Sequence, residues 1–147
     1  MDRATSTHTV LPQCGFTLIE TLTSVMILAI LSSIAWASYR DVLLRAHRGE
    51  ARTALLQLQA AQERHYLDHL RYSGLLEAAP DADGLGLAAT TPGGRYALHL
   101  ALADDGQHYV ASARPAPGSA QAADTVCGQF TITESGDMSA TSPVCWP

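Results

Sequence analysis

The chain has 147 residues, enough for one folded domain, and its 9 basic and 14 acidic residues give it a net charge of −5. This acidic balance argues against a broad nucleic-acid-binding surface, because such a surface presents basic charge to the phosphates. Hydrophobic residues make up 47% of the chain. The mean hydropathy of +0.05 is high for a small soluble protein, which indicates that apolar residues are concentrated in one part of the chain.

That concentration lies in the first quarter of the chain. Residues 21–39, TLTSVMILAILSSIAWASY, contain no charged residue. As a helix they would extend roughly 28 Å, close to the roughly 30 Å of bilayer hydrocarbon. A removed secretion signal has a shorter apolar core followed by a small-residue cleavage site, whereas this run continues into a second helical pattern from Tyr39 onward. The sequence therefore predicts a retained membrane span.

A single carboxylate, Glu20, stands at the head of the apolar run. An ionised carboxylate within a bilayer costs about 3 kcal/mol or more, so its position needs a reason. One interpretation is a residue at the interface end of a membrane helix, reaching back to the lipid head groups.

The stretch GFTLIE, residues 15–20, followed by the apolar run, resembles the processing signal of type IV prepilins and pseudopilins. The resemblance implies that prepilin peptidase cleaves between Gly15 and Phe16 and that the new amine of Phe16 is methylated. It also implies that Glu20 is the assembly carboxylate. Pairing with the Phe16 amine of the same or a neighbouring subunit would offset the cost of burying the charge and set the register of docking.

The segment departs from the family pattern at several positions. The leader contains one basic residue, Arg3, and Ala29 and Ala37 stand where many pilins have a helix-breaking glycine and proline. We therefore expect the helix to be continuous through the span. Three arginines follow the span, and the charge-bias rule would place that side in the cytoplasm; they are Arg40, Arg45 and Arg48.

The three cysteines help to predict on which side of the membrane the C-terminal region lies. Cys14 lies in the leader, and a lipoprotein signal is disfavoured because the apolar segment follows this cysteine instead of preceding it. Cys127 and Cys145 have 17 residues between them, a spacing suited to a disulfide loop worth about 3 kcal/mol. Two unpaired buried thiols are the alternative. A persistent disulfide requires an oxidising compartment, which predicts that the C-terminal region lies outside the cytoplasm.

Beyond the span the helical pattern becomes amphipathic. Apolar residues recur at three- and four-residue steps and predict a stripe that packs against a sheet; they are Ala51, Ala54, Leu55, Leu58 and Ala61. The helix is expected to end at residues 72–74, where Gly74 can take the left-handed capping conformation.

The rest of the chain predicts a loop and then a sheet. Residues 74–95 contain five glycines and two prolines and no sustained period, which indicates a surface loop region. Turn signals and alternating apolar residues predict four consecutive antiparallel strands, at residues 96–102, 108–113, 126–133 and 138–141. One long helix packed on such a sheet gives an α+β fold, and this element order matches the pilin fold.

The mature chain also carries a more specific resemblance. The residues concerned are ARTALLQLQAAQERHYLDHLRYS, YALHL, Gln121, Asp124, Cys127-Gly128 and Cys145-Trp146, and together they resemble the PilE/ComP group of minor type IV pilins. The resemblance implies a removed leader at 1–15, a transmembrane or filament-core helix at 16–39, an amphipathic helix half at 40–72 and a sheet region at 73–147. The segment between Cys127 and Cys145 would be exposed on the fibre.

The implied function is that of a minor pilin, a structural subunit that contributes to pilus biogenesis and so to twitching motility, adhesion or DNA uptake. The implied partners are prepilin peptidase, the major pilin, other minor pilins, the inner-membrane assembly platform and membrane lipid. Before assembly the chain would cross the inner membrane once, with its C-terminal domain in the periplasm. After assembly it would lie on the pilus. A pseudopilin of a type II secretion system remains an alternative.

A DNA-uptake receptor is the other alternative. From Arg40 onward the chain has 8 arginines, no lysines and 12 acidic residues, a net charge of −4, which disfavours duplex binding. A small basic patch within this acidic domain would have four candidate residues, namely Arg64, Arg71, Arg95 and Arg114.

Other patterns give no site. His65 and His69 are four apart on the predicted helix, but no third metal ligand lies nearby in sequence and the glutamate of an HExxH motif is absent. Residues 81–84, DADG, lack the glutamate that closes a calcium loop and are interpreted as a turn. No nucleophile-elbow sequence is present. We therefore predict no catalytic residues, no metal and no cofactor, and a protein that is not an enzyme.

Overall fold

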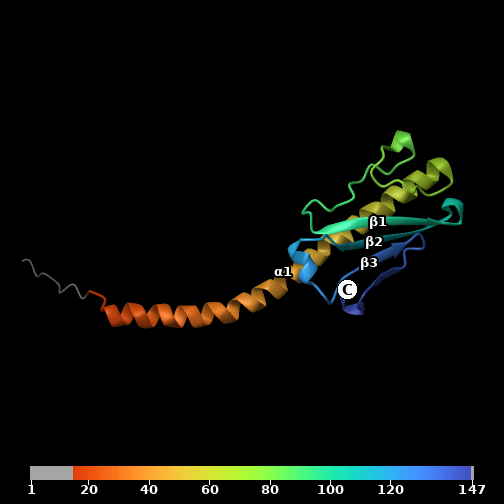
Figure 1. Cartoon of the computed structure of the whole chain (residues 1–147). Helices are drawn as coiled ribbons and strands as arrows, with labels where there is room; N and C mark the ends of the chain where they lie inside the picture. Colours follow the sequence, from red (N-terminus) through yellow and green to blue (C-terminus); the bar gives the residue numbers. More distant parts are fainter. Residues whose placement is uncertain (1–14, 147) are drawn as a thin grey trace, which may run out of the picture. The chain divides into compact units, whose positions relative to one another are not determined.

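The structure is a computed structural model of the chain, and it describes residues 15–146. The expected leader residues 1–14, Cys14 among them, lie outside the described residues. The chain divides into two compact units, one up to Tyr39 and one from Arg40 onward. A long helix, α1 (Leu18–His69), contributes residues to both (Figure 1). It is unbroken at Ala29 and Ala37, as expected from the missing glycine and proline.

The start of α1 is fixed by a local cap. The backbone N–H of Glu20 is shared between the Thr17 carbonyl at 3.1 Å and Thr17 Oγ1 at 3.3 Å, so Thr17 caps the first turn. Within the apolar segment, Thr21, Ser24 and Ser33 donate their hydroxyls to backbone carbonyls of the preceding turn at 2.7–2.8 Å. These polar groups are therefore satisfied inside the helix and need no partner outside it.

The second unit contains a four-stranded antiparallel sheet in the order β1-β2-β3-β4. The strands are β1 (Tyr96–Ala103), β2 (His108–Pro115), β3 (Phe130–Thr133) and β4 (Met138–Ala140). Each strand pairs with the one that follows it in sequence, through short turns between β1 and β2 and between β3 and β4. The predicted sheet is confirmed.

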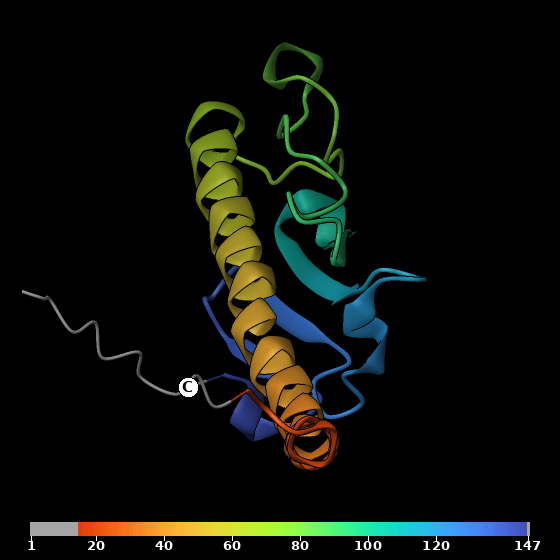
Figure 2. The ribbon, with the colours of Figure 1, turned by 90° about the vertical axis from the view of Figure 1, so that its left-hand side faces the viewer.

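The core of this unit lies between the second half of α1 and one face of the sheet (Figure 2). The predicted stripe of five apolar residues on α1 is buried, with Leu55 and Leu58 at 0% exposure. The facing side chains come from alternate positions on the strands, because successive strand residues point to opposite faces. They include Tyr96, Leu98, Tyr109, Ala111, Phe130 and Ile132. The α+β fold with one long helix on an antiparallel sheet is therefore confirmed.

The end of α1 differs from the prediction. The helix stops at His69, and Leu70, not Gly74, adopts the left-handed conformation, with φ 56°. The chain leaves the helix early because hydrogen bonds to distant residues hold it. Gln62 accepts from the Ser73 N–H at 2.9 Å and donates to the Ser73 carbonyl at 2.8 Å. One residue before Ser73, the Tyr72 N–H donates to the Gly106 carbonyl at 2.8 Å.

Two strand details also differ. β3 begins at Phe130 and not at Val126, because the N–H of Cys127 donates to Asp124 Oδ1 at 3.2 Å and the backbone there is not part of the sheet. Leu102, predicted on the inner face of the first strand, is 40% exposed because the end of β1 extends beyond the core. Residues 74–95 form the expected irregular region, with one short 3-10 turn at Pro80–Ala82.

Candidate functional site

The expected cleavage site lies directly before α1. Gly15 and Phe16 precede the first helical residue, and the Phe16 side chain is 81% exposed. A Cβ added at Gly15 would meet no atom within 4 Å. Among the described residues, the Gly15–Phe16 peptide therefore belongs to an accessible, non-helical segment.

Glu20 lies in the first turn of α1, where the positive end of the helix dipole stabilises a carboxylate. Its backbone N–H is used by the Thr17 cap. Within residues 15–146, no hydrogen bond joins the Glu20 carboxylate to another side chain. The carboxylate is therefore available for a partner.

The apolar part of α1 presents large side chains to its surroundings. These side chains are 53–82% exposed, and they include Leu18, Ile19, Leu22, Val25, Met26, Ile27, Leu28, Ile30, Leu31 and Ile34. An 18-residue window of this helix has a mean hydropathy of 2.0, and none of it is buried within the unit. A contiguous apolar surface of this kind requires lipid or packed neighbouring helices.

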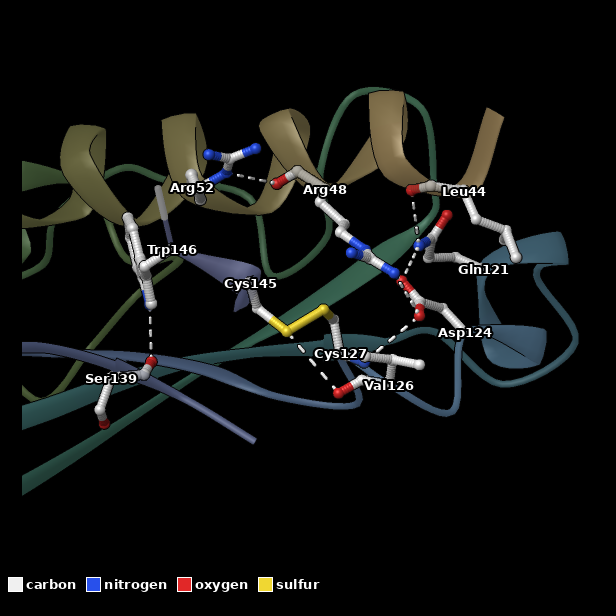
Figure 3. The surroundings of a disulfide bond; sticks show 10 residues. All are labelled: Leu44, Arg48, Arg52, Gln121, Asp124, Val126, Cys127, Ser139, Cys145 and Trp146. Atoms are coloured by element: carbon white, nitrogen blue, oxygen red, sulfur yellow. Dashed lines mark hydrogen bonds and ion pairs between the residues drawn. A yellow bond between two sulfur atoms is a disulfide. The ribbon is translucent and has the colours of Figure 1, made fainter. Parts of the chain in front are cut away.

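A disulfide joins Cys127 to Cys145 in the second unit (Figure 3). Both cysteines are buried, and the bond encloses β3, the turn after it and β4. The predicted pairing is therefore confirmed, and the alternative of two unpaired thiols is wrong.

Beside the disulfide, α1 is tied to the connection between β2 and β3 by a charged network (Figure 3). Arg48 donates from Nε and Nη2 to the two carboxylate oxygens of Asp124 at 2.7 and 3.0 Å. Gln121 Nε2 donates to Asp124 Oδ2 at 3.0 Å and to the Leu44 carbonyl at 3.2 Å. The hydrogen bond to Asp124 raises the pKa of the Arg48 guanidinium further. The Asp124 side chain is 2% exposed, so its carboxylate has almost no contact with water.

Sequence reasoning missed this network. Gln121 and Asp124 entered only through a resemblance, and Arg48 only as a charge after the span. The Arg48–Asp124 partners are 76 positions apart, so no local pattern links them. The one available signal was an acid three residues before a cysteine in an otherwise small-residue connection.

The four arginines considered for DNA binding do not form one free basic patch. Arg71 donates to Asp83 Oδ2 at 2.7 Å, and Arg95 pairs with Glu50 at 2.9 Å. Burial raises the pKa of the Glu50 carboxyl, but hydrogen bonds from Thr91, Gly93 and Arg95 outweigh it and hold that pKa below its usual value. The other two, Arg64 and Arg114, are exposed, and Arg114 contacts Gln129 at 3.1 Å.

The two histidines of α1 gain a neighbour that sequence reasoning also missed. Asp83, interpreted as part of a turn, lies in the loop region with Oδ1 at 3.1 Å from His65 Nε2. Candidate ligand atoms of His65, His69 and Asp83 lie within 4.8 Å of one another. The fold thus supplies the third polar group whose absence argued against a metal.

Comparisons with known proteins give matches for two segments of the chain. A family model described as the type IV minor pilin ComP, DNA uptake sequence receptor, matches residues 37–131. A second model, the prokaryotic N-terminal methylation motif, matches residues 11–36. Among solved structures, a type IV pilin from Shewanella oneidensis is similar, with a TM-score of 0.49 and 20% identity over 71% of this chain and 98% of that one. No curated protein matches the chain.

Proposed function

The chain belongs to the ComP family of minor type IV pilins, and on that premise we propose that it is cleaved after Gly15, methylated at Phe16 and assembled from the inner membrane into a pilus as a structural subunit. The observation that carries this proposal is the contrast between the two units. The second unit buries its own core, whereas the apolar half of α1 buries nothing and presents one carboxylate at its start.

Processing by prepilin peptidase is supported by the methylation motif, which spans the Gly15–Phe16 junction. The absence of a side chain at Gly15 lets the backbone approach a peptidase site closely. Cleavage creates an amine at Phe16, four residues before Glu20 and close to the same helix end. Opposite charges at this spacing pair favourably once both leave water.

The proposed orientation is supported by the cysteines. A stable disulfide in the second unit requires an oxidising compartment, so this unit is periplasmic before assembly and on the pilus surface after it. The exposed apolar helix then holds the subunit in the inner membrane until the assembly platform passes it into the fibre. There the major pilin and other minor pilins replace the lipid around it.

The test replaces Glu20 by Gln in cells that make normal major pilin. Membrane insertion and cleavage should be unchanged, because removing a charge only lowers the cost of insertion. The amount of the variant in sheared pili should fall while the membrane pool stays constant or grows, since the amide cannot form the ion pair. Intact-mass analysis of the membrane pool should show a chain beginning at methylated Phe16.

Two further variants sharpen this test. Glu20→Asp keeps the charge and shortens its reach by one methylene, so partial assembly would indicate that geometry matters beside charge. Glu63→Gln removes an exposed carboxylate from the second half of α1 and serves as the matched control. Entry of the Glu20→Gln protein into pili at the level of the control would show that Glu20 is only a membrane-interface residue.

A second candidate function is reception of DNA during uptake. It is favoured by the matched family, which is described as a DNA uptake sequence receptor, and by the exposed Arg64 and Arg114. The net charge of −4 from Arg40 onward opposes it. The two functions are compatible, because a receptor of this kind would itself be a subunit of the pilus.

A further inference from the structure

The last turns of α1 and residues 80–85 of the loop region border a hollow of about 260 Å³ that the minor-pilin role does not use. His65 and His69 line it from the helix, and Pro80, Gly84 and Leu85 line it from the loop. Its volume exceeds the roughly 30 Å³ that a water molecule takes, so there is room beside the two histidines for the water ligands of an ion.

The hydrogen bonds of His65 fix which ring nitrogen carries a proton. The ring is 7% exposed, and Nδ1 lies 2.9 Å from the backbone carbonyl of Arg71. A carbonyl only accepts, so Nδ1 carries the hydrogen, and in the neutral ring Nε2 is then an acceptor. Nε2 nevertheless faces a second acceptor, Asp83 Oδ1, at 3.1 Å. Two acceptors in this position require a cation between them, either a proton or a metal ion.

A second imidazole lies beside the first. His69 follows one helical turn later, and the two rings stack with centroids 4.2 Å apart. His69 Nδ1 donates to the His65 carbonyl at 3.1 Å, which leaves its Nε2 as an acceptor too. Histidines that bind metals characteristically donate their other N–H to a carbonyl or carboxylate, and His65 does so to the Arg71 carbonyl, which fixes its ring tautomer.

We propose that His65, His69 and Asp83 form a binding site for Zn²⁺. Two imidazole nitrogens and one carboxylate oxygen, with a water in the fourth position, are a common zinc ligand set. Imidazole favours zinc over Ca²⁺ and Mg²⁺, which prefer oxygen ligands.

Binding requires a small adjustment. Zinc ligands lie about 2.0–2.1 Å from the metal, so two of them are no more than about 4.2 Å apart, compared with the 4.8 Å limit of this cluster. His65 is buried and stays in place. The exposed His69 ring turns out of its stack until its plane meets the ion, and the Asp83 side chain, 40% exposed, moves inward.

Neighbouring charges affect how many ligand atoms the site offers and how tightly it binds the ion. Arg71 holds Asp83 Oδ2 at 2.7 Å, which leaves Oδ1 as a single ligand atom, and Arg64 and Asp68 border the hollow. The positive charges of Arg64 and Arg71 lower the affinity for Zn²⁺, but neither arginine bonds to the ligand nitrogens of the histidines. The bound ion would join the end of α1 to residues 74–95, the irregular region between α1 and β1.

The test uses the full chain purified in detergent without a histidine tag, at about pH 7.5, where histidine is mainly neutral. Titration with Zn²⁺ against a chromophoric chelator should show one bound ion, and an excess of Mg²⁺ or Ca²⁺ should not displace it. His69→Gln should weaken zinc binding by about tenfold or more, since even the loss of a second-shell group costs that much. His99→Gln, which removes another exposed histidine from β1, should leave it unchanged.

X-ray absorption of the zinc-loaded chain should show imidazole scattering that decreases in His69→Gln. Asp83→Asn keeps the size of the third ligand and removes its charge, so it should weaken binding with little change in the unfolding temperature of the zinc-free chain. No zinc binding by the unmodified chain, or equal weakening by His69→Gln and His99→Gln, would overturn the proposal. In either case the contact between His65 and Asp83 would serve only to hold the loop against the end of α1.

Discussion

At the scale of single residues, Asp124 makes structural contacts that no local sequence pattern indicates. Its carboxylate accepts from the Arg48 guanidinium, the Gln121 amide and the Cys127 N–H, and it does so almost without contact with water. An isolated charge in such a place is costly, but each oxygen here has donors from different segments. The residue therefore joins α1, the β2–β3 connection and the disulfide at one point.

Replacing Asp124 with Ala should destabilise the second unit by about 3–5 kcal/mol, because the Arg48 charge and two further donors lose their partner in a buried site. Urea unfolding of a chain comprising residues 40–147 measures this change. Asp41→Ala is the matched control, since the Asp41–Arg45 pair is exposed and should contribute less than about 1 kcal/mol. Similar losses in the two variants would show that the Asp124 network adds nothing beyond a surface ion pair.

At the scale of elements, β4 is the least secured part of the sheet. It has three residues and pairs only with β3, whereas β1 and β2 pair along eight positions. Trp146 adds one bond from Nε1 to the Ser139 carbonyl at 2.7 Å. The disulfide joins the two ends of the segment that contains β3 and β4, so we infer that it stabilises these strands chiefly by limiting how far that segment can open.

The double variant Cys127→Ala with Cys145→Ala should lower the free energy of unfolding by about 3 kcal/mol, the amount expected for a loop of this length. The loss should appear as faster amide exchange in β4 before β1, since the protection of β1 comes from its pairing with β2. Non-reducing peptide mapping of the unmodified exported chain should recover the two cysteine peptides joined. Uniform loss of protection across all four strands would contradict a local role for the disulfide.

At the scale of the whole molecule, charge separates the two candidate functions. The second unit carries an excess of acidic residues, and its structure pairs Arg48, Arg71 and Arg95 with carboxylates. Such pairs reduce the positive potential that phosphates would meet. A receptor for DNA must therefore obtain its affinity from a small number of contacts to particular sequences.

We expect residues 40–147 to bind duplexes of random sequence weakly and to lose that binding between about 0.05 and 0.2 M salt. Fluorescence anisotropy over this range measures it. If the unit is a receptor, one sequence should bind at the higher salt, and the double variant Arg64→Gln with Arg114→Gln should weaken that binding more than the carboxylate-paired Arg71→Gln with Arg95→Gln. Tight binding of random duplexes at the higher salt would contradict the charge argument.

The sequence by itself determined the features that depend on neighbours along the chain. The apolar run gave the exposed apolar half of α1, three- and four-residue steps gave its buried stripe, and alternation with turn residues gave four strands in the right order. These patterns repeat every two to four residues, so a short window contains the whole signal. The two cysteines near the C-terminus added the disulfide, because they had no other plausible partner outside the leader.

Only the tertiary structure decided where those elements stop and which polar groups meet. Gln62 holds Ser73 and ends α1 before the glycine that sequence favoured, and Asp124 holds Cys127 outside β3. In the same way Asp83 reaches His65 from a loop that had been interpreted as a simple turn. Each of these contacts joins groups whose proximity is created by the packing of α1, the sheet and the loops. No periodic pattern records such proximity, because buried polar groups take whichever partner the fold brings within hydrogen-bond distance.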